Sequence, residues 1–289
     1  MLNTNLYSEQ ILSLYNEGKT GKEIQLALGF KNHQPVYNFL RKHGLPNNQR
    51  SYKRLYTLNE HYFDKIDTEA KAYILGFICA DGHVAENRIC IELAQQDLDI
   101  LNKISNCLNS NSPIKEFLVE NPYKFSSRKL LGKAKISFNS KYMVSVLRQY
   151  GLQSSKTYSL NSSVLKVVPK KLIRHFLRGY FDGNGNVMFG KRYASGKKYN
   201  VNVCGNQEFL LNTFQKYFPS NNKMYYDKKS VQCYVWKISS KDKVIEFLNY
   251  LYENATIYLN RKYNIYLSAH VKQGELLETP IIKDNQQPS

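Results

Sequence analysis

Two ten-residue stretches decide how this chain folds: LGFICADGHV (Leu75–Val84) and RGYFDGNGNV (Arg178–Val187). Aligned without a gap, they place small residues at the same positions of both copies: Gly76 with Gly179, and Ala80 with Gly183. Small residues four positions apart on a helix let two helix backbones approach closely. The duplication therefore predicts two apolar helices, one in each copy, that pack against each other.

Each predicted helix runs into an acidic, glycine-rich corner. The first ends at Asp81 and Gly82, and the second has Asn184 where the first has Asp81. Carbonyl dipoles make the potential at a helix C-terminus negative, so an aspartate there is unfavourable unless a cation offsets it. A single Asp-Gly pair is common in ordinary turns. Here, however, a duplicated helix with small residues at the same spacing ends in the same kind of corner, which favours a functional site.

The segments after each corner repeat as well. The first copy contains the strand-like stretches RICIELA and KAKISFN, and the second contains KYNVNVC and CYVWKIS, with helical stretches after each. The order is helix, two strands, helix, two strands and helix, twice over, which predicts an α+β fold with pseudo-twofold symmetry. We place the first unit at residues 64–165 and the second at 166–272, followed by a loose tail over 273–289.

A smaller all-α domain is predicted over residues 1–46. Three short helices fit within residues 8–43: Thr20 precedes Glu23 at the spacing of a capping box, and Gly29 ends the second helix. Helix, glycine turn and helix is the layout of a helix-turn-helix, which reads DNA with its last helix. The residues expected on the exposed side of that helix are Gln34, Tyr37, Asn38 and Arg41. The alternative is a helical hairpin with no role in DNA binding, because Gln25 stands where the motif usually has alanine.

Composition limits the partners. The chain has 41 Lys and Arg against 23 Asp and Glu, a net charge of +18, which favours a polyanion such as nucleic acid. A basic linker is predicted over residues 47–63. The five scattered cysteines form no CxxC pair, so neither a disulfide framework nor a zinc site is indicated. The polar N-terminal sequence and the lack of a long apolar stretch predict an intracellular protein that is neither secreted nor bound to a membrane.

The two corners resemble the paired motifs of the LAGLIDADG homing endonucleases. The stretches IDTEAKAYILGFICADG, IRHFLRGYFDGNGNV and LNRKYNIYL are also similar to that family, and the resemblance covers about residues 64–267. It implies two αββαββα units whose sheets form a saddle on double-stranded DNA, preceded here by the helix-turn-helix. It also implies hydrolysis of both DNA strands by a monomer with a divalent cation, Mg²⁺ or alternatively Mn²⁺ or Ca²⁺.

The same resemblance implies roles for individual residues. Asp81 takes the metal-ligand position of the first copy and Asn184 that of the second, while Lys156 and Lys262 stand where the family places a lysine beside each site. Lysines that contact phosphate or lie on the surface are the alternative for these two. For DNA contacts on the second sheet, the basic hairpin GKRYASGKKYNVNV singles out Arg192, Lys197 and Lys198.

Asn184 leaves three interpretations open. An amide brings no negative charge to a metal, so the expected endonuclease cuts the two strands unequally. The other interpretations are a DNA-binding regulator that cuts nothing and an RNA maturase that holds a folded intron. For the endonuclease, the expected origin is an intron or a phage, which implies a bacterial or phage-infected cytoplasm or an organelle.

Overall fold

The computed structural model describes residues 4–45, 55–122, 129–153, 160–193, 196–228 and 233–271. For residues 4–5, 191–193, 196 and 271 it describes the backbone alone. The chain divides into two compact units, Met1–Leu55 and Tyr56–Ser289.

The first unit is a bundle of short helices. Its elements are η1 (Thr4–Tyr7), α1 (Ser8–Asn16), α2 (Gly21–Ala27) and α3 (Gln34–Lys42). The three helices expected from the sequence are thus confirmed, and Thr20 and Glu23 form the predicted capping box. Gly29 ends α2 with a φ of +69°, a conformation that glycine adopts at little cost. The small core is apolar and consists of Ile11, Ile24, Phe30, Val36, Phe39 and Leu40.

The second unit repeats one series of elements. The first half contains α4 (Glu69–Asp81), β1 (Gly82–Val84), β2 (Arg88–Ala94), η2 (Gln95–Asp97), α5 (Leu98–Cys107), β3 (Lys115–Glu120), β4 (Leu130–Asn139) and α6 (Lys141–Gln149). The second half contains η3 (Ser162–Val167), η4 (Lys170–Leu172), α8 (Ile173–Asn184), β5 (Gly185–Tyr193), β6 (Gly196–Gly205), α9 (Gln207–Leu210), η5 (Leu211–Gln215), β7 (Tyr225–Asp227), β8 (Cys233–Ile238), α10 (Lys241–Tyr252) and α11 (Asn260–Val271). The predicted order of helices and strands is confirmed in both halves.

Each half forms a four-stranded antiparallel sheet. The strand orders are β1-β2-β4-β3 and β5-β6-β8-β7, so the two sheets have the same topology. The register is also the same at the corners, because Gly82 pairs with Ile91 in the first sheet and Gly185 pairs with Val203 in the second. Residues of the two halves can therefore be compared position by position.

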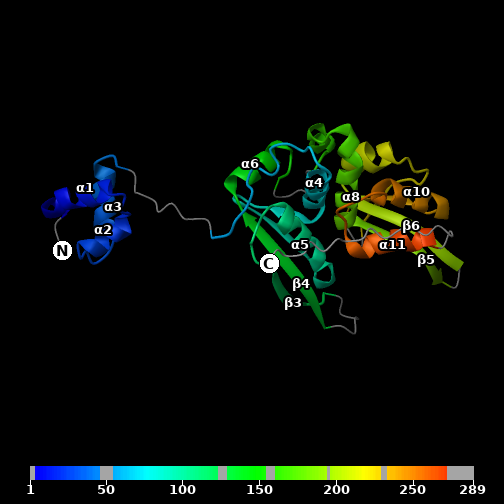
Figure 1. Ribbon diagram of the computed structural model, residues 1–289, viewed down its shortest axis with the longest axis horizontal. Helices are drawn as coiled ribbons and strands as arrows, with labels where there is room; N and C mark the ends of the chain where they lie inside the picture. Colours follow the sequence, from blue (N-terminus) through cyan, green and yellow to red (C-terminus); the bar gives the residue numbers. More distant parts are fainter. Residues whose placement is uncertain are drawn as a thin grey trace, which may run out of the picture. The chain divides into compact units, whose positions relative to one another are not determined.

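One face of each sheet is buried and the other is open. Ala134, Ile136 and Phe138 alternate along β4 as buried residues, and Val201 and Val203 do so along β6. The helices pack on this face, with α5 along the first sheet and α10 and α11 along the second (Figure 1). The alternate residues of β4 and β6 are more exposed, which leaves the opposite face of each sheet accessible.

The linker is shorter than the predicted range of residues 47–63. Tyr62 and Phe63 are buried in the core of the second unit, and Leu58 packs against it. The backbone N–H of Thr57 donates to the Asn111 side chain at 2.7 Å. Apolar and aromatic side chains at the end of this basic segment thus attach it to the first half.

The helical stretch after β6 is less regular than expected from its sequence. The α-helix α9 gives way to η5, a wider π-type turn. The buried Thr213 hydroxyl donates to the carbonyl of Phe209, four residues earlier, at 2.5 Å. A side chain thus satisfies a backbone carbonyl in this irregular segment.

Within the described ranges, every helix is too short or too polar to cross a membrane.

Candidate active site and nucleic-acid interface

The site is built on two helices in backbone contact. In the middle of the second unit, α4 and α8 lie side by side (Figure 1). A Cβ atom on Gly76 would overlap the Phe176 carbonyl oxygen of α8, and one on Gly179 would overlap the Tyr73 carbonyl oxygen of α4. Only glycine fits at these two crossing points, because a side chain on either helix would collide with the backbone of the other helix.

The two helices end at neighbouring corners. The last residue of α4 is Asp81 and the last residue of α8 is Asn184, and both side chains are partly exposed. A Cβ atom on Gly183 would overlap that of Ala80 and lie 3.1 Å from Oδ2 of Asp81, which places the end of α8 against the first carboxylate. The next residue of each half is a glycine in extended conformation that begins β1 or β5. The corners therefore join the helix pair to both sheets.

The side-chain oxygens at the two corners fit a cation whose remaining ligands are water and phosphate oxygens. Among the described residues, no group of three or more His, Cys, Asp or Glu side chains could hold a metal ion. Asp81 supplies one carboxylate and Asn184 one amide oxygen. Mg²⁺ is commonly bound by one or two carboxylates together with water and phosphate oxygens. The corner thus fits Mg²⁺ only as a partial set of ligands that a phosphate group would complete.

Lys262 lies beneath the second corner and is fully buried. Its Nζ atom donates hydrogen bonds to three backbone carbonyls at the end of α8, those of Phe181, Asp182 (2.9 Å) and Gly185 (2.6 Å). Burial lowers the pKa of Lys262 to about 8, although the nearby carboxylates of Asp182 and Asp81 oppose that shift. A cation at this place stabilises the negative end of the helix. The sequence indicated this lysine but not its three carbonyl acceptors.

Lys156, the counterpart expected in the first half, lies outside the described residues. The structure therefore brings Asp81, Asn184 and Lys262 to one region and leaves the position of Lys156 as a prediction.

Asp182 is buried two residues before the second corner and is fully hydrogen-bonded. Its carboxylate accepts from the hydroxyls of Tyr73 (2.7 Å) and Tyr252 (2.5 Å) and from the N–H of Leu259 (2.8 Å). Burial raises its pKa, and the charge of Lys262 opposes that effect. These donors come from both halves, so Asp182 joins α8 to α4, α10 and the segment before α11.

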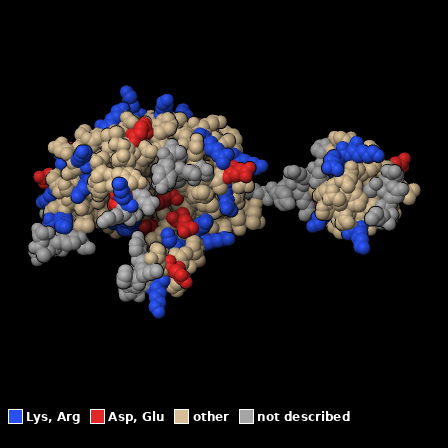
Figure 2. All heavy atoms as spheres, turned by 180° about the vertical axis from the view of Figure 1, so that it is seen from behind, with Lys and Arg blue, Asp and Glu red and all other residues tan. Residues whose placement is uncertain are grey.

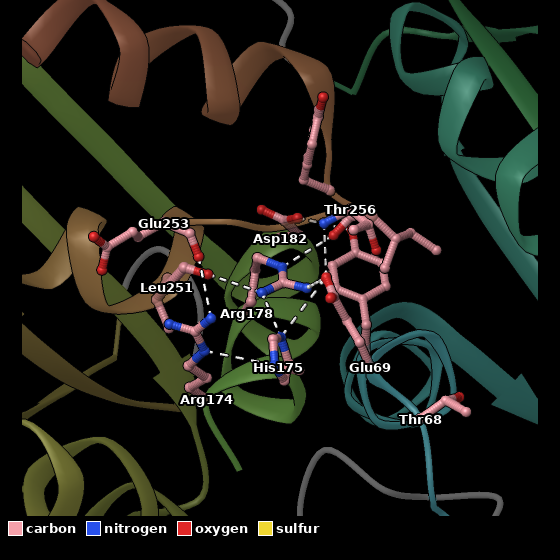
Figure 3. Close-up of polar contacts among 12 residues, drawn as sticks. Thr68, Glu69, Arg174, His175, Arg178, Asp182, Leu251, Glu253 and Thr256 are labelled. Atoms are coloured by element: carbon pink, nitrogen blue, oxygen red, sulfur yellow. Dashed lines mark hydrogen bonds and ion pairs between the residues drawn. The ribbon is translucent and has the colours of Figure 1, made fainter. Parts of the chain in front are cut away.

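An ion pair between the buried Arg178 and the partly buried Glu69 connects the halves further along the same helices (Figure 3). The Arg178 guanidinium donates to Glu69 Oε1 at 2.6 Å and to the carbonyls of Leu251 and Ile257, and its Nη1 lies 2.8 Å from His175 Nδ1. Burial, followed by the charge of Arg178, lowers the pKa of His175 to about 4. Sequence reasoning missed this cluster, although an arginine in the middle of a buried helix is a signal that could have indicated it.

The open face of the second sheet is polar next to its corner. Register places Asn186, Asn202 and Lys237 in one row across β5, β6 and β8, and Asn200 and Lys198 follow on the same face of β6. Lys197 and Lys198 are both exposed, but consecutive strand residues point to opposite faces, so Lys197 is not on this row's face. The side chain of Arg192 lies outside the described part of the chain.

The first sheet has a mixed but mainly basic row on the same kind of face. Lys115, Lys135 and Glu92 are register partners across β3, β4 and β2. Glu92 lies 3.6 Å from Lys135 and 3.9 Å from Lys133, which offsets part of the positive charge. Lys and Arg side chains outnumber Asp and Glu side chains over the face of the second unit seen in Figure 2.

The first unit presents the residues expected on its third helix. Gln34, Asn38 and Arg41 are exposed on α3 and Tyr37 is partly exposed. They interact along the helix, because Asn38 Oδ1 accepts from Gln34 at 3.2 Å and from Arg41 at 3.4 Å. These residues thus form one continuous polar face, with the core of the unit behind it.

No protein-family model matches the sequence, and no curated protein matches it. Among solved structures, the chain is similar to the LAGLIDADG meganuclease I-AabMI bound to uncleaved DNA (14% identity, TM-score 0.45, covering 72% of this chain and 92% of that chain). It is also similar to I-SmaMI bound to an uncleaved DNA target with calcium ions (13%, 0.44, 70% and 91%). A third similar structure is the LAGLIDADG homing endonuclease I-GzeII in complex with its DNA target (14%, 0.42, 72% and 92%).

Proposed function

We propose that this chain is a metal-dependent DNA endonuclease of the LAGLIDADG type. The observation that supports this most is the meeting of two duplicated helices at Asp81 and Asn184, where β1 and β5 begin. A hydrolytic site for a duplex needs two reacting positions close together beside a surface that binds the backbone. The paired corners and the open polar faces of the two sheets fit that need.

The proposed roles follow from the positions of the side chains. Asp81 is the charged metal ligand of the first corner, and Asn184 offers an amide oxygen at the second. A divalent cation bound there would lower the pKa of a water molecule and offset the charge that develops on phosphate. Lys262 holds the end of α8 through three carbonyls and keeps the second corner in place. Polar side chains on the open faces contact bases and phosphates.

The first unit is proposed to bind DNA as well. The polar face of α3, formed by Gln34, Tyr37, Asn38 and Arg41, would enter the major groove next to the main target. The net charge of +18 supports nucleic acid as the partner of the whole chain.

A direct test starts with a duplex selected by binding from randomised DNA. The full chain is incubated with this duplex in Mg²⁺ or in a chelator, and each strand carries its own label. We expect Mg²⁺-dependent cuts at fixed positions, with one strand cut faster than the other. Tight binding without a cut on either strand would support the second candidate, a DNA-binding regulator, which the amide at Asn184 favours.

A further inference from the structure

The two corners differ in more than their last residue. In the aligned helices, Tyr180 occupies the position that Phe77 has in the first half, four residues before the corner. Residues four apart on a helix lie on the same face, so the residue at 180 lies next to the residue at 184. The second half thus pairs a phenol with an amide, whereas the first half pairs a phenyl ring with a carboxylate.

The Tyr180 hydroxyl is hydrogen-bonded on both of its sides. Tyr180 is 2% exposed, and its hydroxyl donates its proton to the Cys204 carbonyl of β6 at 3.0 Å. On the other side, the Asn184 side chain follows one turn later on α8, within hydrogen-bonding reach of the hydroxyl. Because the only proton of the hydroxyl is directed at Cys204, the hydroxyl can only accept from Asn184. An amide N–H₂ can donate that hydrogen bond, whereas an ionised carboxylate cannot.

The neighbouring strand leaves room for this hydroxyl. A Cβ atom on Gly205 would lie 2.6 Å from the Tyr180 oxygen, so a larger residue there would displace the ring. Register makes Gly205 the counterpart of Leu93, which is buried in the first half. Three positions therefore change together, from Phe77, Asp81 and Leu93 in the first half to Tyr180, Asn184 and Gly205 in the second.

We propose that Tyr180 is a positioning residue that holds the Asn184 amide by accepting its N–H₂, so that the second corner is built for an amide and not for a carboxylate. The amide nitrogen of Asn184 is then directed at the Tyr180 hydroxyl, and the amide oxygen is directed at the corner, where it can bind a ligand. The contact between Tyr180 and Asn184 requires neither DNA nor metal. Its consequence for cutting rests on the proposed endonuclease function. The substitution Asn184→Asp is then not enough to make the second corner equivalent to the first. The Tyr180 hydroxyl would have to redirect its proton from the Cys204 carbonyl to the new carboxylate.

The hydrogen bond is tested first, without DNA or metal. The full chain labelled with ¹⁵N-asparagine gives a side-chain amide signal for Asn184, which is assigned by its loss in Asn184→Asp. In Tyr180→Phe we expect this signal to shift and its hydrogen exchange to accelerate about tenfold, the effect of one lost hydrogen bond. Tyr250→Phe, which removes a partly buried hydroxyl on α10, is the matched control and leaves the signal unchanged. An Asn184 signal that is insensitive to Tyr180→Phe in a folded protein overturns the proposal.

The second test measures the consequence for the slower strand and for metal binding. We expect Asn184→Asp to cut that strand roughly tenfold more slowly than the double variant Tyr180→Phe/Asn184→Asp. Mn²⁺ binding to a complex with phosphorothioate duplex, followed by electron paramagnetic resonance, should also be tighter in the double variant. Equal rates and equal Mn²⁺ affinities in the two variants contradict the proposal. If the amide signal responds as expected but no variant cuts either strand, the endonuclease function fails and the positioning role of Tyr180 stands.

Discussion

At the scale of single residues, the first corner depends on one carboxylate at the end of α4. Of the two aspartates near the ends of α4 and α8, Asp81 is partly exposed, whereas Asp182 is buried and its carboxylate is fully hydrogen-bonded. An aspartate at a helix C-terminus is stabilised by a nearby cation, and phosphate is repelled by it when no cation is bound. In the proposed function, the same charge would make the corner depend on a bound metal ion.

We expect Asp81→Asn to abolish cutting of the first strand while DNA affinity is retained or increased. The substitution removes the charged ligand, and it also removes a negative charge beside phosphate. Cleavage assays in Mg²⁺ and binding assays in Ca²⁺ measure the two effects separately. Wild-type cutting by this variant would contradict the assigned site.

Lys262 is expected to matter for stability as well as for cutting. Lys262→Met leaves three carbonyls at the end of α8 without their buried donor, which should lower the free energy of unfolding by about 3 kcal/mol. Thermal or denaturant unfolding measures this. Lys243→Met, at an exposed lysine on α10, is the control and should change stability little. A stable Lys262→Met protein would show that the carbonyls find other donors.

At the scale of elements, contact between α4 and α8 is made by backbone against backbone. The glycines at the crossing have no room for a methyl group, so the two halves cannot be separated without loss of the corners. A cluster of the partly buried Glu69 with the buried His175 and Arg178 lies along the same pair of helices, and we expect it to make their contact sensitive to acid.

Gly76→Ala is expected to destabilise the second unit by about 2 kcal/mol or more, because the added methyl group must push α8 away. Denaturant unfolding of the purified variant measures the loss. Ala72→Gly, one turn earlier on α4, is a useful comparison because it loses helix propensity and a buried methyl group without adding bulk. A Gly76→Ala protein with unchanged stability would contradict the close crossing.

Acid should weaken the same interface. The pKa of His175 is about 4 in the fold against an ordinary 6.5, so the folded state binds this proton less readily than the unfolded chain. The contribution of neutral His175 is complete above about pH 6.5 and is lost as the pH falls towards 4. We expect Tm to fall between these values and to fall less in His175→Asn, which keeps an acceptor for Arg178. His61→Asn, at an exposed histidine, serves as the control. Equal pH profiles for wild type and His175→Asn would contradict this role.

At the scale of the whole molecule, the chain combines two separately folded units with a strong positive charge. The core of the first unit is complete in itself, and so is that of the second. Two linked modules on one DNA raise each other's effective concentration.

We expect a variant lacking residues 1–45 to remain folded and to cut with unchanged strand preference at a higher DNA concentration. Circular dichroism and strand-resolved cleavage test this. Loss of folding on deletion would show that the first unit is structural.

Binding of the full chain should fall by at least about a hundredfold between roughly 50 and 200 mM salt, because many phosphate contacts release counterions. Fluorescence anisotropy with the selected duplex measures the slope, and an affinity that does not depend on salt would contradict a phosphate-binding surface.

The sequence by itself determined the repeated order of helices and strands, the three helices of the first unit and the ends of the two central helices. These features depend on local patterns: small residues at helical spacing, alternating apolar residues and glycine after a helix. The tertiary structure alone decided what surrounds the corners. The carbonyl acceptors of Lys262, the donors to Asp182, the Arg178 cluster and the Tyr180–Asn184 pair join residues that are distant in the chain or depend on a neighbouring strand. Local patterns cannot specify such partners, because burial and hydrogen-bond geometry arise only when the two halves pack together.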